Sequence, residues 1–213
     1  MTVLWIMAAS IMIAVLYILL QIRKIGTPTT GAKIDLASRP ETALLVIDMQ
    51  TDFTSIPTWD DAQIEGALST IRSTTDSARQ SDWSVIAIRH EFKGRLANLL
   101  NGWFNQGRGN AGSDGVGLDP RLALNPDAEF VKSVGDAFSS PGFERFLQDK
   151  RIGTLVLTGL DGCHCVNKTA QGALNRGYRV QINSAAVLAA DPNRWQGIRD
   201  QLATAGVDFR LQK

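Results

Sequence analysis

From residue 41 onward, short apolar runs alternate with longer segments whose apolar residues recur at helical spacing. The apolar runs predict strands at residues 42–47, 83–88, 129–132, 154–158, 178–182 and 207–211. The helical spacing predicts helices at residues 60–79, 141–150, 166–176 and 193–205. Strands that alternate with helices form a mostly parallel sheet with helices on both of its faces. The chain therefore predicts an α/β fold.

Reactive side chains follow the predicted strands. Asp48, His90, Lys132 and Cys165 each stand at or just beyond the end of an apolar run. Ligands of such folds bind at the carboxyl ends of the strands, so we group these four residues as one candidate site. A formal net charge of +1 gives no strong field for nucleic acid, so we predict no nucleic-acid partner. The strand-end position of the four residues is that of a ligand site, which suits a small-molecule substrate.

Cys165 lies in a glycine-bearing turn between an apolar strand and a helical segment. Free N–H groups and the helix dipole favour negative charge there, so we expect a nucleophilic thiolate. A thiol nucleophile also needs a proton carrier and a place for an oxyanion. Asp48 is the candidate carrier, and Lys132 would favour the ionised groups by its charge. Backbone N–H groups of the 160–165 turn could hold the oxyanion.

Three motifs resemble those of the isochorismatase-like cysteine hydrolases. They are LLVIDMQTDF at residues 44–53, KSVGDAF at residues 132–138 and GLDGCHCV at residues 159–166. The resemblance covers roughly residues 41–191, and the motifs stand in the family's order. One such motif would be weak evidence, whereas three together are specific.

The resemblance implies a three-layer α/β/α fold around a six-stranded parallel sheet, and a catalytic triad of Asp48, Lys132 and Cys165. It also implies a cis peptide bond between Leu160 and Asp161, which turns the N–H groups of Asp161 and Cys165 toward an oxyanion. Members with this cysteine mostly hydrolyse C–N bonds of amides, carbamoyl groups or ureides through a thioester, without a cofactor. Members that cleave the vinyl ether of isochorismate generally lack the cysteine, which disfavours that reaction.

Several further residues are candidate substrate contacts. They are Gln50, Phe53, Trp59, His90, Trp103 and His164. The aromatic residues could line an apolar pocket for a ring-bearing substrate, although packing is the commoner role of a buried aromatic. The glycine-rich stretch of residues 93–117 is either a lid or disordered.

Metal binding is an alternative that the sequence disfavours. Cys163, His164 and Cys165 are soft ligands, but a structural zinc needs four, and His90 is the only other histidine or cysteine. The nicotinamidase branch carries Asp-x-His and a further histidine after the second strand. This chain has Arg89, His90 and Glu91 there, so we predict no metal and no zinc-dependent nicotinamidase.

Residues 3–20 are almost wholly apolar, and as a helix of about 27 Å they would just cross a bilayer core of roughly 30 Å. Arg23 and Lys24 follow, which predicts an outside N-terminus and a cytoplasmic catalytic domain. A cleaved signal peptide would carry positive charge before the run. A core helix is the third interpretation. We assign residues 1–22 to a membrane anchor, 23–40 to a linker with a flexible tether at 26–31, and 41–213 to the hydrolase domain.

Three other functional interpretations stay open. The chain could be a membrane-tethered scaffold that has kept the fold without turnover, or it could cleave another type of bond. A Cys165–His90 pair, with the histidine as base, is a different way to activate the thiol. The sequence is also compatible with a homo-oligomer.

Overall fold

The computed structural model describes residues 27–93, 98, 101–102 and 106–209, together with Trp5, Met12 and Leu16. Its centre is a parallel five-stranded sheet in the order β3-β2-β1-β4-β5. The strands are β1 (Glu41–Ile47), β2 (Ser84–His90), β3 (Ala128–Lys132), β4 (Ile152–Gly159) and β5 (Arg179–Val187). The predicted α/β architecture is confirmed.

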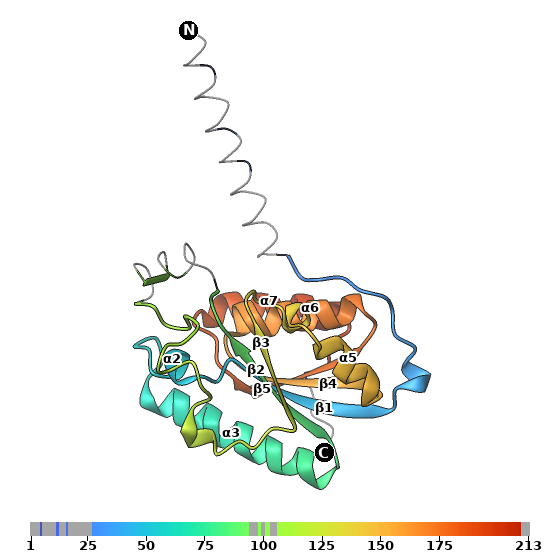
Figure 1. Cartoon of the computed structure of the whole chain (residues 1–213). Helices are drawn as coiled ribbons and strands as arrows, with labels where there is room; N and C mark the ends of the chain where they lie inside the picture. The colour runs from blue at the N-terminus through green and yellow to red at the C-terminus, as the bar shows by residue number, and fades with distance from the viewer. Residues whose placement is uncertain are drawn as a thin grey trace.

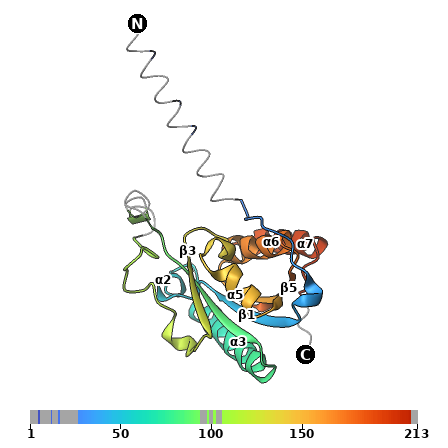
Figure 2. The ribbon, with the colours of Figure 1, turned by 45° about the vertical axis from the view of Figure 1, so that its right-hand side comes forward.

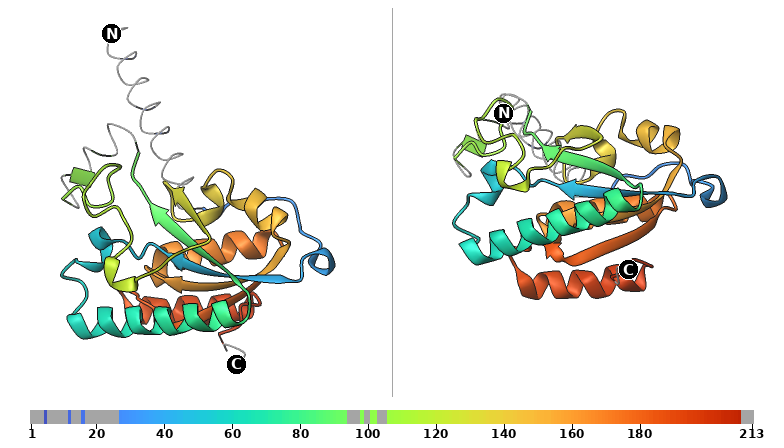
Figure 3. Two further views of the ribbon diagram at one scale, coloured as in Figure 1. Left: turned by 60° about the horizontal axis from the view of Figure 1, so that its bottom comes forward. Right: turned by 90° about the horizontal axis from the view of Figure 1, so that it is seen from below.

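Helices cover both faces of the sheet (Figure 1). The long α3 (Asp61–Gln80) crosses one face, as the right-hand view of Figure 3 shows. The opposite face carries α5 (Phe143–Asp149), α6 (Asn167–Asn175) and α7 (Pro192–Thr204). Successive strand residues point to opposite faces, so in β1 Leu44 and Val46 pack on the α3 side, and Leu45 and Ile47 pack on the other. This explains why β1 is an uninterrupted apolar run.

The boundaries of α3 follow from local chemistry. Asp60 accepts a hydrogen bond from the Gln63 N–H at 2.7 Å, and the Gln63 side chain accepts one from the Asp60 N–H at 3.0 Å. This capping box satisfies two donors that a helix start leaves free. Ile64, Leu68 and Ile71 then recur at helical spacing and are buried against the sheet. The helix predicted at residues 60–79 is therefore confirmed.

The prediction of six strands is wrong for the part of the chain that the structure describes, which contains five. Within the segment predicted as a sixth strand, Asp208 makes a single parallel bridge to Gln181, and residues 210–213 lie outside the described residues. Conversely, β5 continues past its predicted end at residue 182. Asn183 interrupts the apolar run but is buried and donates to Thr74 Oγ1 of α3 at 2.9 Å, which lets a polar residue sit inside the strand.

The segment after residue 26 is bound to the domain, so the flexible tether predicted there is wrong for its described residues. Asp136 is buried and accepts hydrogen bonds from Thr29 N and Thr29 Oγ1 at 2.8 and 2.7 Å. Arg176 donates to Thr29 Oγ1 at 2.9 Å and to the Thr30 carbonyl at 3.0 Å. Threonine-rich composition indicates a loop, but it does not show which buried charges the loop will meet.

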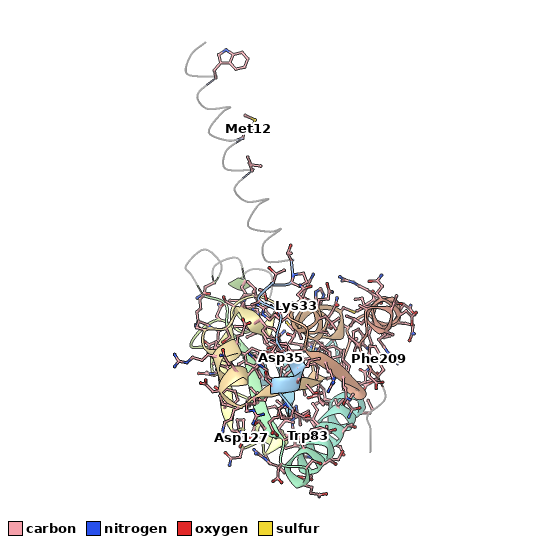
Figure 4. All side chains as sticks on the ribbon, turned by 90° about the vertical axis from the view of Figure 1, so that its right-hand side faces the viewer. Met12, Lys33, Asp35, Trp83, Asp127 and Phe209 are labelled. Atoms are coloured by element: carbon pink, nitrogen blue, oxygen red, sulfur yellow. The ribbon has the colours of Figure 1, made fainter. Side chains whose placement is uncertain are left out.

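Figures 1 and 2 show this segment passing along the outside of the domain toward β1. Lys33 and Asp35, labelled in Figure 4, belong to it. Lys33 Nζ donates to the Leu174 carbonyl of α6 at 3.2 Å, and a 3₁₀ turn (Leu36–Ser38) follows. The linker is therefore part of the folded domain from about residue 27 onward.

The predicted membrane span at residues 3–20 lies outside the described residues, apart from Trp5, Met12 and Leu16. These three side chains are exposed. Within the described part of the chain, no helix has both the length and the apolar character that crossing a membrane requires. The anchor therefore stays a prediction.

Candidate active site

The carboxyl ends of four neighbouring strands bring the grouped side chains together. Asp48 directly follows β1, His90 ends β2 and Lys132 ends β3. Cys165 comes from a π-helical turn (Gly162–Val166) that links β4 to α6. Parallel strands end at one edge of the sheet, and this places all four groups at one site, as predicted.

Lys132 is the centre of this cluster and is almost completely buried. Its Nζ lies 2.7 Å from Asp48 Oδ2, 3.0 Å from His90 Nδ1 and 3.2 Å from Cys165 Sγ. An ammonium group has three donors and no acceptor, so these three contacts use all of its protons. Burial lowers the pKa of Lys132, but the charges of Asp48 and Cys165 outweigh it and raise that pKa overall.

The thiol is not the ready thiolate that its place near a helix start predicts. Burial and the negative charge of Asp48 raise the pKa of Cys165 to about 12, and Lys132 opposes them only in part. The dipole of a helix contributes typically 0.3–1 kcal/mol, which is too little to reverse such a shift. These surroundings favour the neutral thiol over the thiolate, so Cys165 must lose its proton when it attacks.

Asp48 is placed to take that proton. Lys132 engages Asp48 Oδ2, whereas Asp48 Oδ1 is buried and has no hydrogen-bond partner among the described residues. A carboxylate oxygen of Asp48, the thiol sulfur of Cys165 and a ring nitrogen of His90 lie within 4.8 Å of one another. A small substrate group at Cys165 would thus meet an unpaired carboxylate oxygen.

The turn after β4 is arranged by Asp161. The Leu160–Asp161 peptide bond is cis, as the sequence resemblance implies. Oxygen atoms of Asp161 accept the backbone N–H groups of Cys163, His164 and Val166. The Gly162 N–H donates to the Leu188 carbonyl at 2.8 Å. The remaining N–H groups of the turn belong to Asp161 and Cys165, the pair expected to hold an oxyanion.

A cavity of about 230 Å³ opens onto these groups. It is lined by Asp48, Phe53, Ile56, Thr58, Trp59, His90, Phe92, Leu160, Asp161, Cys165 and Ala190. Most of this lining is apolar, which favours a small apolar substrate body with its reacting atom at Cys165. A larger hollow of about 640 Å³ lies at the other end of the strands, around Trp83 (Figure 4) and Tyr178, and contains no thiol.

Apart from Gln50, the predicted substrate contacts divide into three groups. Phe53, Trp59 and His90 line the cavity. His164 is exposed and is not part of the lining, so the structure does not support it as a contact. Trp103 lies outside the described residues.

The structure does not support Gln50 as a substrate contact, because its side chain is buried and its amide is hydrogen-bonded to the backbone. Its Oε1 accepts the His90 N–H at 2.6 Å, and its Nε2 donates to the carbonyls of His90 and Val116 at 3.1 and 2.7 Å. This side chain fixes the end of β2 and therefore positions His90, and it is not among the residues that line the cavity described above.

Sequence reasoning missed four residues of the lining: Ile56, Thr58, Phe92 and Ala190. Phe92 carried a usable signal, because it stands two residues beyond His90 and alternation puts both on one side of an extended chain. The two rings lie with their centroids 4.4 Å apart. The other three come from irregular segments that have no periodic pattern.

The Cys-His-Cys triplet does not converge on a metal. Cys163 is buried, and its thiol contacts the Asp191 carbonyl at 3.4 Å, away from the exposed His164. Asp48, His90 and Cys165 each offer a ligand atom that a divalent metal ion could use, but the Lys132 ammonium group contacts all three side chains. A metal ion there would have to displace a buried positive charge, so this donor set fits a metal poorly.

Comparison with known proteins agrees with this fold. Residues 42–210 match the isochorismatase domain. The chain is 31% identical over 169 residues to a probable inactive nicotinamidase of Arabidopsis thaliana, covering 71% of this chain and 82% of that protein.

Two crystal structures have a similar fold. The N-carbamoylsarcosine amidase of Thermoplasma acidophilum has a TM-score of 0.68 and 24% identity, over 81% of this chain and 98% of that chain. The nicotinamidase of Bacillus subtilis has a TM-score of 0.68 and 21% identity, over 79% and 99%.

Proposed function

This chain belongs to the isochorismatase family, and we propose that it is a cysteine hydrolase that cleaves a carbon–nitrogen bond of a small molecule. The bond would belong to an amide, carbamoyl or ureide group. The observation that carries the proposal is the contact of Lys132 with both Asp48 and Cys165 at the end of an apolar cavity. Its structural neighbours named nicotinamidase and N-carbamoylsarcosine amidase support the same bond class.

In the first half of the reaction, Cys165 Sγ attacks the carbonyl carbon while Asp48 takes the thiol proton. The N–H groups of Asp161 and Cys165 stabilise the oxyanion that forms. Asp48 then returns the proton to the leaving nitrogen, which departs as ammonia or an amine. The acyl group stays on sulfur as a thioester.

In the second half, water attacks the thioester and Asp48 accepts a proton from it. The C–S bond breaks, the acid product leaves, and the proton returns to Cys165. Lys132 keeps Asp48 ionised and stabilises the sulfur whenever it carries negative charge. Both half-reactions thus use one carboxylate as base and then as acid.

A second candidate is a binding protein of this fold without turnover, since one relative is named a probable inactive nicotinamidase. In that case Cys165 would be acylated once, and the acyl group would not be released by water. Lys132 contacts both Asp48 and Cys165, so all three members of the cluster are in place, and this favours the hydrolase.

We also propose that residues 3–20 anchor the protein in a membrane, with the domain on the cytoplasmic side. The apolar run and the Arg23–Lys24 pair support this topology. Because Thr29 is hydrogen-bonded to the domain, residues 21–28 would be all that separates the span from this first attachment point. Alkaline extraction and protease protection of membranes test it; full extraction by carbonate would contradict it.

The hydrolase proposal is tested by screening small amides for ammonia release. Wild-type protein and the Cys163→Ala variant should release ammonia, whereas Cys165→Ala and Asp48→Asn should not. Intact-mass measurement during turnover should show an acyl adduct that maps to Cys165. A stable adduct without turnover would favour the binding protein, and full activity of Cys165→Ala would reject the mechanism.

A further inference from the structure

The proposed reaction needs Lys132 and Cys165 to stay in contact, although the two residues come from different elements. Lys132 ends β3, which is an edge strand of the sheet and is paired with β2 on one side. Cys165 lies in the turn that leads into α6. A lysine side chain is a flexible four-carbon stem, so the position of its strand end matters for where Nζ lies. The 3.2 Å contact between Nζ and Sγ therefore depends on what holds the end of β3 against α6.

Asp136 fixes the chain just beyond Lys132. Residues 133–135, which separate the two, are partly or fully exposed, whereas Asp136 is only 2% exposed. One of its carboxylate oxygens accepts the Phe138 N–H at 3.0 Å and caps the short 3₁₀ turn η3 (Ala137–Ser139). Asp136 is thus the first buried residue that the chain reaches after the catalytic lysine.

This part of the chain is fastened to α6. The Asp136 carboxylate lies directly against Gly172 of α6, where an added Cβ would collide with both carboxylate oxygens. The next residue, Ala137, donates its N–H to Thr169 Oγ1 of α6 at 3.1 Å. Because α6 begins directly after the turn that contains Cys165, these contacts join the end of β3 to the element that carries the thiol.

Thr29 completes this connection from the segment before β1. The second carboxylate oxygen of Asp136 accepts both the N–H and the hydroxyl of Thr29, at 2.8 and 2.7 Å. The same hydroxyl accepts a hydrogen bond from Nη1 of Arg176, which caps the end of α6 and is 4% exposed, at 2.9 Å. Asn175 Nδ2 donates to the Thr29 carbonyl at 2.9 Å. Thr29 therefore stands between a buried carboxylate and a buried guanidinium group.

We propose that Asp136 is a positioning residue that keeps Lys132 in contact with Cys165. Thr29 is its required partner, so the segment before β1 is part of the catalytic apparatus. This inference rests on the proposed function, in which the lysine acts on the thiol. A buried carboxylate that lost both Thr29 hydrogen bonds would be short of partners and would move toward water. The end of β3 would then no longer be held against α6.

Two substitutions displace the carboxylate in different ways. Asp136→Asn removes its charge and one of its acceptors, whereas Gly172→Ala keeps the carboxylate and places a methyl group where it lies. Gly66→Ala is the matched control, because Gly66 is also a helical glycine and its added Cβ meets open space among the described residues. Alanine favours a helix at both glycine positions, so a difference between them comes from the collision. Thr29→Ser is the conservative variant that keeps both donors.

The first measurement is the steady-state kinetics of amide hydrolysis by the full chain, below the onset of thermal unfolding of every variant. Asp136→Asn and Gly172→Ala should lower kcat about ten-fold or more, since a misplacement of about 1 Å can cost about 100-fold. KM should change little, because Lys132 is not among the residues that line the cavity. Gly66→Ala and Thr29→Ser should keep the wild-type values.

The second measurement is iodoacetamide labelling of Cys165 at pH 9, which needs no substrate. Burial and Asp48 raise the pKa of this thiol, and Lys132 opposes them. Withdrawal of Lys132 should therefore slow the labelling about three-fold or more in Asp136→Asn and Gly172→Ala, as half a pKa unit does. A role in stability alone would loosen the site and expose the thiol, so labelling would become faster. Peptide mapping reads Cys163 in the same sample as the internal standard.

Faster or unchanged labelling of Cys165 in both variants would overturn the inference, and so would equal kcat values in Gly172→Ala and Gly66→Ala. If Asp136→Asn does not fold, Gly172→Ala decides the question, because it removes no charge and no hydrogen-bonding group. Slower labelling in these variants, together with no amide hydrolysis by the wild-type protein, would contradict the proposed function and leave the positioning role of Asp136 intact.

Discussion

Lys132 Nζ lies 2.7 Å from Asp48 Oδ2, and the two side chains are 0% and 3% exposed. Both charges are almost completely removed from water, so each depends on the other for stabilisation. Desolvation of such a pair can cost as much as the attraction returns, so the pair is weak evidence of a stabilising role. Removing either partner of the pair, however, leaves the other as an uncompensated buried charge. The arrangement suits a site that must hold a carboxylate ionised next to a thiol.

Asp48→Asn should therefore destabilise the protein by about 3–5 kcal/mol, because Lys132 keeps a buried charge without a counter-charge. Urea unfolding at neutral pH measures the change. Arg79→Gln is the control, since Arg79 pairs with Asp127 at the surface with both side chains about 40% exposed. That exposed pair should contribute at most about 1 kcal/mol. Equal losses in the two variants would show that the Asp48 pair is not buried as described.

The free energy of unfolding should fall as the pH drops from 6.5 to 4. In this range His90 binds a proton in the unfolded chain, whereas the buried His90 of the folded protein stays neutral. The pKa of His90 is lowered to about 4 in the folded protein. The stabilisation that comes from the neutral His90 ring is therefore complete above pH 6.5 and is lost as the pH falls toward 4. The loss should be about 3 kcal/mol, from 1.36 kcal/mol per pKa unit.

The pH dependence is measured by urea unfolding at a series of pH values. His90→Gln should flatten it in this range. His164 is the other histidine of the chain and is exposed, so His164→Gln should leave the pH dependence unchanged. A flat profile in the wild-type protein would contradict the neutral, buried state of His90.

Cys165 should resist alkylation in the free protein. Burial and Asp48 raise the pKa of the thiol to about 12, so little thiolate is present at pH 8. Asp48→Asn removes the negative charge and leaves Lys132 beside the sulfur, which should speed iodoacetamide labelling of Cys165 at pH 8 about ten-fold or more. Peptide mapping reads both cysteines in one sample, and Cys163 serves as the internal control. Rapid labelling of wild-type Cys165 at pH 7 would contradict the raised pKa.

The strand ends of the site were predictable because alternation of apolar runs and helices specifies a parallel sheet, and such a sheet gathers the residues that end its strands. Asp48, His90, Lys132 and Cys165 could be grouped for that reason alone. The protonation state of Cys165 could not be predicted in this way. It depends on burial and on the distance to a carboxylate that is over 100 positions away in the chain.

Side-chain roles were harder to predict than side-chain positions. Gln50 follows a strand end as a substrate contact would, yet it is hydrogen-bonded to the backbone at both ends of its amide. The binding of Thr29 to Asp136 joins residues 107 positions apart, and no local pattern encodes it. The second half of β5 was similarly missed because the polar Asn183 interrupts the apolar run. Its hydrogen-bond partner Thr74 lies on α3, which the local sequence of β5 does not reveal.

The segment bound along the domain gives the last prediction. Thr29 Oγ1 donates to the buried Asp136 carboxylate at 2.7 Å and accepts from Arg176 Nη1 at 2.9 Å, so one hydroxyl joins two charged groups. Thr29→Val keeps the shape but leaves both groups short of a partner, which should cost about 1–3 kcal/mol in urea unfolding. Thr30→Val is the matched control, because the structure uses the Thr30 carbonyl and its side chain is exposed. Since Asp136 stands four residues after Lys132, Thr29→Val should also lower kcat for amide hydrolysis more than Thr30→Val does. Identical unfolding curves for the two variants would mean that the segment contributes nothing to the fold beyond its backbone contacts.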